Sequence, residues 1–278
     1  MSAVREYEFT QRDFDFLRRI SNAHTGIVVT DDKFDMFYSR LARRVRLLGL
    51  RSFAQYCDYL EDPGHADELN ELVNALTTNL TAFFRENHHF EFLANKALPE
   101  FARRNRTSGR LRIWSAGCST GEEPYSIAMV LAEQRQKLAG VEPGILASDI
   151  DSNVLAQAEA GIYPMARVEK LERARLKAFF QKGRGSQSGK VRVRDELRRD
   201  IRFQQVNLME PLRVEMQDII FCRNVIIYFD KETKRRLVER FADCLVDGGY
   251  LIVGHSESLY QVTDRFELLG NTVYRKLR

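Results

Sequence analysis

Apolar residues recur at intervals of three and four along the first quarter of the chain, which is the spacing that buries one face of a helix. The pattern predicts four helices. The first starts at the capping-box pattern of residues 10–13, and the second starts at Asp31 and stops before Gly49. The third follows Ser52, and the fourth carries apolar residues on one face over residues 69–80.

Beyond residue 110 the pattern changes to short apolar runs that alternate with helical segments. This alternation predicts an α/β fold with a mostly parallel sheet, helices on both faces, and ligands at the carboxyl ends of the strands. A final pair of strands, 266–269 and 272–277, flanks the turn at Gly270-Asn271 and predicts an edge hairpin. The other predicted strands are 111–115, 145–148, 201–206, 219–223 and 250–253, and the predicted helices are 124–138 and 231–245.

A basic segment interrupts this alternation. Between Arg167 and Arg202 the chain has 13 Lys and Arg against 5 Asp and Glu, whereas the net charge of the whole chain is only +4. Residues 183–189 are rich in glycine and serine, and the alternation over residues 190–194 suits a half-exposed strand. We therefore predict three parts: a helical domain over 1–75, an α/β domain over 76–278, and within it a small basic β-subdomain over 165–203.

The composition excludes several classes of protein. No apolar run approaches the ~20 residues of a membrane-spanning helix, and the first residues lack the apolar core of a signal peptide, so we expect a cytoplasmic protein without membrane insertion. A net charge of +4 does not require a nucleic-acid partner. The four cysteines are scattered, without the paired spacing of a zinc site, so we expect reduced structural thiols and no metal.

The strongest candidate for chemistry lies where the first strand of the α/β region passes into a helix. Residues 114–125 read Trp-Ser-Ala-Gly-Cys-Ser-Thr-Gly-Glu-Glu-Pro-Tyr, and small residues at such a turn let a ligand approach the backbone closely. Asp149 ends the second strand, 32 residues after Gly117, where a carboxylate can accept hydrogen bonds from ribose hydroxyls. These residues point to an adenosine-containing cofactor, although a plain strand-to-helix turn would have the same glycines.

Charge indicates which cofactor fits best. The chain has no Gly-x-x-x-x-Gly-Lys-Ser/Thr motif and lacks the full Gly-x-Gly-x-x-Gly of dinucleotide sites, and Glu122 and Glu123 would repel phosphate. S-adenosylmethionine carries no phosphate and has an ammonium and a sulfonium group. A glycine turn beside carboxylates therefore suits S-adenosylmethionine better than a nucleotide.

Other polar motifs are weaker candidates. Asn224 and Tyr228, after the fourth strand, suit a reaction site, and the alternative for Tyr228 is a core aromatic on the next helix. The Asn/Asp-Pro-Pro-Tyr/Phe and Pro-Cys signatures of nucleic-acid methyltransferases are missing there. Residues 254–258 lack the second glycine of a hydrolase elbow. His88 and His89 would point about 100° apart on a helix, so we expect them not to hold one metal ion.

Two further segments have an ordinary structural interpretation and a functional one. Residues 79–86 link the helical region to the α/β region, and their ordinary interpretation is a helix start with Phe83 and Phe84 in the core. Arg40, Arg43 and Arg44 share one helix face within a stretch that has no acidic residue. That face is either a solvated surface or a docking surface for an acidic partner.

Taken together, these residues resemble the CheR-type chemotaxis receptor methyltransferases, which are protein-glutamate O-methyltransferases. The resemblance implies an all-helical N-terminal domain joined to a Rossmann-like methyltransferase domain, with a small antiparallel β-subdomain, in agreement with the pattern above. It covers nearly the whole chain and rests on residues 75–86, 114–125, 147–151, 221–230 and 254–257.

The resemblance also implies the site. It places Glu123 at the amino-acid end of S-adenosylmethionine, Asp149 at the ribose, and the catalytic residues Arg85 and Tyr228 nearest to the transferred methyl group. The implied cofactor-binding residues are Asn79, Thr81, Arg85, Gly117, Glu123, Asp149, Asn207, Leu208, Arg223 and Asn224.

The implied reaction transfers this methyl group to receptor glutamates and leaves S-adenosylhomocysteine. A glutamate with a pKa of ~4.3 is ionised at neutral pH, so no general base is needed and Arg85 acts mainly in orientation. Arg40, Arg43 and Arg44 become candidates to dock on the cytoplasmic methylation helices of chemoreceptors, and we expect a monomer.

The basic β-subdomain is implied to bind a receptor's C-terminal pentapeptide by strand addition. Its candidate contacts are Gly183, Gly185, Arg192 and Arg194. Two other functions stay open: a non-catalytic module that binds S-adenosylmethionine or its product, and a nucleic-acid methyltransferase that uses the basic segment, which the missing signatures and the low net charge disfavour.

Overall fold

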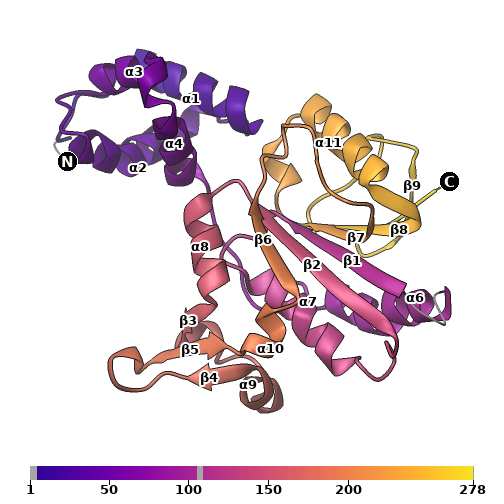
Figure 1. The fold of residues 1–278 in the computed structure, drawn as a ribbon. Helices are drawn as coiled ribbons and strands as arrows, with labels where there is room; N and C mark the ends of the chain where they lie inside the picture. The colour runs from indigo at the N-terminus through magenta and orange to yellow at the C-terminus, as the bar shows by residue number, and fades with distance from the viewer. Residues whose placement is uncertain (1–4, 105–108, 278) are drawn as a thin grey trace.

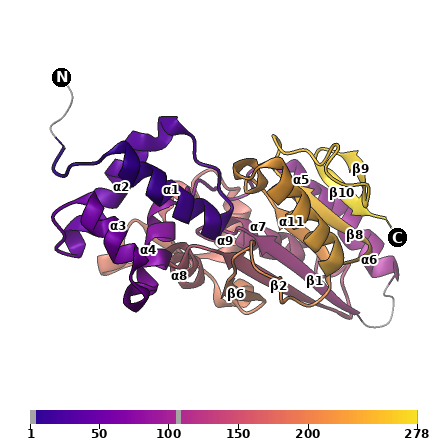
Figure 2. The same cartoon turned by 90° about the horizontal axis from the view of Figure 1, so that it is seen from above.

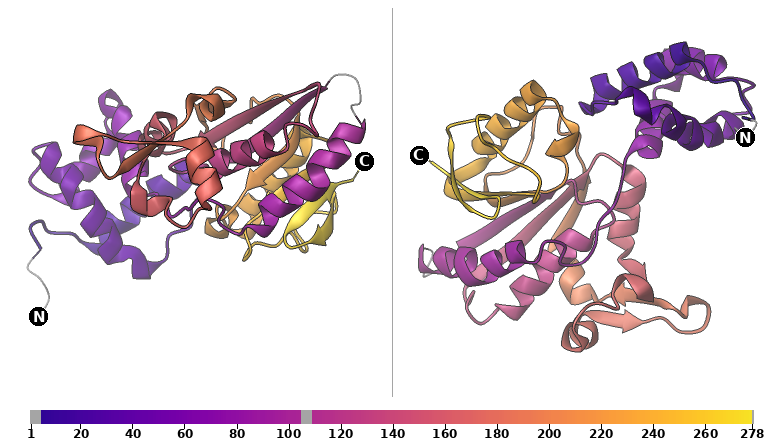
Figure 3. Two further views of the ribbon diagram at one scale, coloured as in Figure 1. Left: turned by 90° about the horizontal axis from the view of Figure 1, so that it is seen from below. Right: turned by 180° about the vertical axis from the view of Figure 1, so that it is seen from behind.

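The computed structural model describes residues 5–104 and 109–277. A helical domain and a small three-stranded sheet both project from a larger α/β domain (Figure 1). They lie on the same side of the molecule, away from the C-terminal hairpin, as the view from behind also shows (Figure 3). This architecture confirms the predicted fold class.

The helical domain begins as its sequence predicts. Thr10 caps the first helix in a reciprocal capping box with Asp13, and Ser52 caps the third through the N–H of Gln55. Its core is aromatic and aliphatic, with Phe14, Phe37 and their neighbours fully buried. The helices are α1 (Gln11–Thr25), α2 (Phe34–Leu47), α3 (Phe53–Glu61) and α4 (Asp67–Leu76), with 3₁₀ turns η1 (Asp31–Lys33) and η2 (Pro63–His65) between them.

The fourth helix ends earlier than predicted. It stops at Leu76, and Leu80 is 74% exposed instead of lying on a buried face. Polar contacts explain the early end, because the Arg40 guanidinium donates to the carbonyls of Leu76 and Thr77 at 2.6 and 2.9 Å. The side chains of Thr77 and Asn79 then both donate to Asp151 Oδ2, which draws the chain into an extended path.

The main sheet has seven strands in the order β6-β2-β1-β7-β8-β10-β9. The five strands from β6 to β8 are mutually parallel, and β10 and β9 form the predicted antiparallel edge hairpin. The strands are β1 (Gly109–Ala116), β2 (Val141–Asp149), β6 (Ile201–Gln205), β7 (Gln217–Cys222), β8 (Leu245–Val253), β9 (Phe266–Gly270) and β10 (Val273–Lys276).

Side chains of the sheet alternate between two buried faces, as in other doubly wound sheets. Ile113 of β1 packs with α7, whereas the neighbouring Trp114 packs against Phe241 of α11 on the opposite face. Figure 2 shows α11 along the sheet, with the helical domain set to one side. The helices of this domain are α5 (His88–Phe92), the π-helical turn η3 (Leu93–Ala97), α6 (Leu98–Arg104), α7 (Glu122–Glu133), α8 (Ser152–Ala160), η6 (Ile226–Tyr228) and α11 (Lys231–Cys244).

The small sheet is antiparallel, in the order β3-β5-β4, and confirms the expected β-subdomain. Its first strand, Ile162–Pro164, lies ahead of the predicted start at residue 165. Tyr163 of that strand donates to the carbonyl of Thr120 at 2.7 Å, and Arg167 pairs with the buried Glu122, so the small sheet is tied to the glycine turn. Its elements are β3 (Ile162–Pro164), η4 (Met165–Arg167), α9 (Arg173–Phe179), β4 (Phe180–Lys182), η5 (Gly185–Gln187), β5 (Lys190–Val193) and α10 (Asp195–Arg198).

The helical domain is joined to the α/β domain by backbone contacts as well as by the chain. Ile27 forms an antiparallel bridge with Phe229, and the N–H of Val28 donates to the carbonyl of Tyr228 at 2.8 Å. These contacts fix the end of α1 beside the loop that follows β7. Over the two described segments, no helix is long and apolar enough to cross a membrane.

We predict that a buried ion pair stabilises the helical domain. Arg44 donates to both oxygens of Glu68, which is 6% exposed and also accepts from Tyr56 at 2.9 Å. Removing the charge of Glu68 leaves the guanidinium without its buried partner, so Glu68→Gln should lower the free energy of unfolding by about 3 kcal/mol in a urea titration.

The matched control is Glu71→Gln, because Glu71 pairs with the same arginine at 3.1 Å but its side chain is 42% exposed. That change should cost less than about 1 kcal/mol. If both variants lose the same free energy of unfolding, burial of Glu68 is not the reason why its ion pair stabilises the domain.

Candidate functional site

A pocket opens where the carboxyl ends of β1, β2 and β7 meet the helical domain. Residues of both domains line it, among them Phe37 of α2 and Phe229 of the loop after β7. The predicted catalytic and cofactor-binding residues all lie in its lining, namely Asn79, Thr81, Arg85, Gly117, Glu123, Asp149, Asn207, Leu208, Arg223, Asn224 and Tyr228.

The floor of the pocket is the glycine turn between β1 and α7. The N–H groups of Gly117 and Cys118 both donate to the carbonyl of Ser148 at 2.8 Å, which binds the turn to β2. Gly117 has a φ of 82°, and a Cβ there would collide with the side chain of Val225. Glycine is therefore required on both conformational and steric grounds, and Gly117 lies in the lining of the pocket.

Asp149 stands at the end of β2 beside this turn. Its carboxylate is 8% exposed and accepts the N–H of Ser119 at 2.8 Å and the N–H of Asp151 at 3.0 Å. Burial raises the pKa of Asp149, and these two hydrogen bonds oppose that rise. A carboxylate accepts about four hydrogen bonds, so capacity remains for the hydroxyls of a ligand in the pocket.

Arg223, at the end of β7, joins three parts of the site. Its guanidinium is paired with Glu123 of α7 at 2.9 Å and with Glu86 at 3.2 Å, and it also donates to the carbonyl of Arg85. Burial raises the pKa of Glu123, and the positive charge of Arg223 opposes the rise. The hydroxyl of Ser115 donates to the same carboxylate at 2.7 Å.

Arg85 and Tyr228 lie on the open side of the pocket. Arg85 donates from one Nη to the carbonyl of Leu80 at 2.7 Å and is half-buried. Residues 79–82 are irregular and residues 83–87 form turns, instead of the helix start that the sequence suggests. Tyr228 ends the 3₁₀ turn η6 and is 37% exposed, so it is not the core aromatic of the alternative interpretation. Phe83 is buried, as expected, whereas Phe84 is only partly buried against the same core.

Asn207 and Leu208 border the pocket from the segment after β6. Asn207 donates to the carbonyl of His24 at 2.8 Å and accepts the N–H of Met209 at 2.9 Å. Both ends of its side chain are therefore used within the protein, and it connects α1 to the cofactor region. Leu208 is buried and offers an apolar surface.

The charges of the pocket are separated by depth. The deep end holds the buried carboxylates Glu123 and Asp149, and the buried cation beside them, Arg223, is already paired with carboxylates. The less buried lining contributes the cations Arg85 and Lys33, of which Lys33 is paired with Asp32. This arrangement suits a positively charged ligand at the deep end and an anion that approaches from the open side.

Sequence reasoning assigned no role to Glu86 or Glu257, although both stand in motifs that carry the resemblance. Glu86 accepts the N–H of His255 at 3.0 Å besides pairing with Arg223. Burial acts to raise the pKa of Glu86, but the charge and hydrogen bond of Arg223 outweigh it and lower the pKa. Glu86 and Glu257 both accept N–H groups from segments that lie far away in the sequence. The spacing of residues along one sequence does not reveal such contacts.

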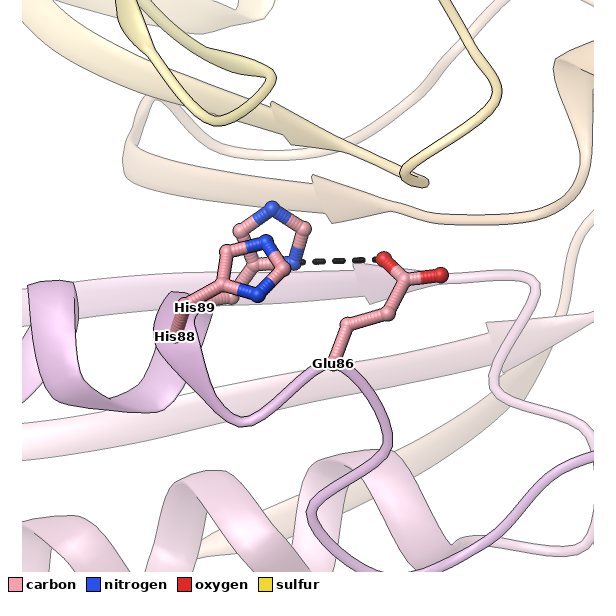
Figure 4. A group of neighbouring side chains, drawn as sticks. All are labelled: Glu86, His88 and His89. Carbon is pink, nitrogen blue, oxygen red and sulfur yellow. Dashed lines mark ion pairs between the residues drawn. The ribbon is translucent and has the colours of Figure 1, made fainter.

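Glu86, His88 and His89 form the one cluster of potential metal ligands within residues 5–104 and 109–277 (Figure 4). Their ligand atoms lie within 4.8 Å of one another, which is closer than we expected for two histidines that point about 100° apart on a helix. His88 is the first residue of α5. Glu86 is also paired with Arg223, and the guanidinium charge disfavours a divalent cation at this carboxylate. His89 Nε2 donates to the carbonyl of Asn271 at 2.8 Å, which anchors α5 to the C-terminal hairpin.

The candidate docking arginines of α2 differ in their surroundings. Arg40 caps the end of α4 and Arg44 pairs with Glu68, so both are used inside the helical domain. Of these three arginines, Arg43 is exposed and the other two are half-buried. The predicted docking surface is therefore limited to the surface around Arg43.

The candidate peptide contacts lie on the small sheet. Arg192 is exposed on β5, with Asp195 3.3 Å away, and Arg194 reaches the carbonyl of Lys177. Gly183 follows β4, where a Cβ would collide with the backbone of Gln187, whereas Gly185 has open space around it.

Comparison with known proteins covers both domains. A family model described as the CheR methyltransferase SAM binding domain matches residues 79–275, and one described as the CheR methyltransferase all-alpha domain matches residues 12–77. The chain is 46% identical over 276 residues to chemotaxis protein methyltransferase 2 of Pseudomonas aeruginosa, covering 97% of this chain and 95% of that relative. It is also 46% identical over 265 residues to the chemotaxis protein methyltransferase of Escherichia coli, covering 92% of this chain and 89% of that relative.

We predict that His89 makes the stability of the protein depend on pH. Burial lowers the pKa of His89 to about 4, and the charge of Arg223 adds to the shift, whereas an unfolded histidine titrates near 6.5. Between these values the unfolded chain binds the additional proton, so stability falls as the pH falls. From pH 7.5 to 5 this group should contribute a loss of about 2 kcal/mol in the free energy of unfolding.

The measurement compares urea titrations at both pH values for the natural chain and for His89→Gln. The natural chain should lose about 2 kcal/mol more than the variant. The control is His255→Gln, which replaces an exposed imidazole and should leave the pH dependence unchanged. The same loss in all three proteins would show that His89 is not the group responsible.

Proposed function

Because this chain belongs to the CheR methyltransferase family, we propose that it transfers the methyl group of S-adenosylmethionine to glutamate side chains of chemotaxis receptors. The products are glutamate methyl esters and S-adenosylhomocysteine, and the reaction serves receptor adaptation. The relatives are named chemotaxis protein methyltransferases, which supports the process but not the chemical nature of the methylated group. The substrate class is supported by the charges of the site.

The separation of charge in the pocket is the observation that carries this proposal. S-adenosylmethionine has an ammonium and a sulfonium group, which suit the buried carboxylates Glu123 and Asp149, and Gly117 of the glycine turn lines the same pocket. A glutamate carboxylate is an anion, which suits the cationic lining on the open side, where Arg85 lies. Methyl transfer between a cationic donor and an anionic acceptor needs these two environments side by side.

When bound, S-adenosylmethionine supplies an electrophilic methyl group. The acceptor carboxylate is ionised at neutral pH, so the protein needs no general base and contributes mainly position, for which an upper scale is ~7–11 kcal/mol. Arg85 orients the carboxylate, and its tie to the Leu80 carbonyl restricts the guanidinium. Charge is neutralised in the transition state, so tight binding of the acceptor carboxylate by Arg85 would stabilise the ground state more than the transition state. Arg85 therefore acts more by orienting the carboxylate than by binding it tightly.

The proposed acceptors are the cytoplasmic methylation helices of receptors, so we place the reaction in the cytoplasm. Arg43 of α2 would meet acidic side chains on these helices. The β-subdomain would bind the C-terminal pentapeptide of a receptor as an added strand along β4, next to the open loop at Gly185 and the exposed Arg192.

The test of the reaction uses methyl-labelled S-adenosylmethionine and receptor-containing membranes, and measures labelled methanol released by alkali. Methyl esters hydrolyse in alkali and methylated amines do not, so base-labile label is expected on the receptor. Base-stable label, or none with a protein that binds S-adenosylhomocysteine, would contradict the proposed acceptor.

We predict that Arg85→Lys lowers kcat about tenfold in this assay and changes the Kd of S-adenosylhomocysteine less than about twofold, because lysine lacks the planar fork that directs a carboxylate. The matched control is Arg235→Lys on the exposed surface of α11. Full turnover and unchanged acceptor affinity in Arg85→Lys would remove the orienting role.

For the β-subdomain we predict that Arg192→Glu weakens binding of a receptor pentapeptide at least about tenfold in calorimetry, by replacing attraction to its carboxylates with repulsion. Arg202→Glu, an equal change of charge on β6 of the main sheet, is the control and should leave the affinity unchanged. If the natural chain binds no receptor tail, peptide tethering is excluded.

A further inference from the structure

Glu257 is a buried carboxylate that the reaction described above does not use. It follows β8 in a turn, is 2% exposed and lies outside the lining of the pocket. Its Oε2 accepts the N–H groups of Gly254 and Asn224, the latter at 2.9 Å, and its Oε1 accepts the N–H of Ile227 at 3.1 Å. All the hydrogen bonds that place this side chain therefore come from backbone.

Two of the three donors belong to the loop between β7 and α11, which carries Asn224 and Tyr228 into the pocket. Asn224 has a φ of 60°, a left-handed conformation that asparagine adopts more readily than most residues, and here its N–H points to Glu257. Glu257 binds the N–H of this residue and, three positions on, the N–H of Ile227. It thus fixes the backbone immediately before Tyr228.

The packing around the carboxylate leaves little freedom. A Cβ on Gly254 would come within 2.8 Å of Glu257 Oε2 and 2.9 Å of the Asn224 nitrogen, so the turn and the loop are in direct contact. Burial raises the pKa of Glu257, and the backbone N–H groups oppose the rise. A second carboxylate, Glu86, accepts the N–H of His255 and connects the same turn to the segment of residues 79–86, which contains Arg85.

We propose that Glu257 is a positioning residue for methyl transfer, which holds the loop of residues 224–228 so that Asn224 and Tyr228 face the reacting groups. This inference rests on the proposed function for its readout of turnover. Glu257 does not touch the pocket, so its effect passes through the backbone of the loop.

The chemistry of a carboxylate explains why glutamate is needed at this position. Both of its oxygens accept, whereas glutamine has one accepting oxygen and one NH₂ donor. If the glutamine oxygen takes the place of Oε2, its NH₂ group faces the N–H of Ile227 and this donor is left unsatisfied. The end of the loop at Tyr228 then loosens, while Glu123 keeps the hydroxyl of Ser115 on β1 and Asp149 keeps the N–H of Ser119 in the glycine turn.

The experiment compares Glu257→Gln with the natural chain in three measurements. Turnover is divided by the number of sites that bind S-adenosylhomocysteine in calorimetry, which removes any unfolded fraction. We expect kcat per site to fall about tenfold, with the KM for S-adenosylmethionine and the Kd of S-adenosylhomocysteine changed less than about twofold. Hydrogen exchange of the peptide over residues 221–229 should lose the protection of the Ile227 N–H.

The matched control is Asp218→Asn, because Asp218 also accepts a backbone N–H, that of Arg112 at 2.8 Å, at the opposite end of β7. It should leave kcat per site unchanged. If Glu257→Gln does not fold, Glu257→Asp keeps both accepting oxygens one methylene further away and should show the same split between kcat and the Kd of S-adenosylhomocysteine.

Unchanged kcat per site in Glu257→Gln, or a parallel loss of kcat and of S-adenosylhomocysteine affinity, would overturn the positioning role. Failure of the proposed function is distinguishable from this result. If the natural chain forms no base-labile ester but Glu257→Gln still loses the protection of Ile227, the proposed acceptor is wrong and the hold on the loop stands.

Discussion

The buried guanidinium of Arg223 is the interaction on which the site depends. From the end of β7 it connects Glu123 of α7 with Glu86 and the carbonyl of Arg85 in the 79–86 segment, three parts of the chain that only the fold brings together. A buried cation without these partners would be costly, and so would the carboxylates without the cation. The network therefore holds the linker between the domains against the end of β7 and leaves Arg85 on the open side of the pocket.

The separation of charge follows from this network. Three carboxylates, Glu86, Glu123 and Asp149, lie around the buried cation Arg223. An excess of negative charge therefore remains at the deep end for a cationic ligand, while Arg85 lies on the open side. Gly117, whose turn leaves no room for a side chain beside Val225, lines the same pocket. A cationic methyl donor and an anionic acceptor can then be held in one cleft without a protein base.

Local patterns predicted the elements whose burial is repetitive along the sequence. The strand over residues 111–115 in a sheet with helices on both faces, and the caps at Thr10 and Ser52, were predicted from the sequence and are confirmed. Helices α5, α6 and α8 were not predicted. The fourth helix was extended too far, because its end is set by Arg40 and Asp151, which lie far from it in the sequence.

The site shows the same limit. Glycines at a strand-to-helix turn and an acidic residue after the next strand are local signals, so Gly117 and Asp149 could be found from spacing. Asn207 and Arg223 came from the resemblance to a family, since no local rule distinguishes them from ordinary surface or core residues. Tyr228 was a candidate from its place after the fourth strand, with a core aromatic as the alternative. Glu86 and Glu257 act through backbone N–H groups of segments far away in the sequence, and only three-dimensional structure reveals such contacts.

The most direct test of the central claim is a crystal structure of the protein with S-adenosylhomocysteine. The account predicts the adenosyl group over the glycine turn, the ribose hydroxyls on Asp149, the amino-acid end beside Glu123, and the sulfur directed toward Arg85 and Tyr228. A pocket that stays empty at saturating ligand, or a ligand bound with its sulfur turned away from Arg85, would contradict it.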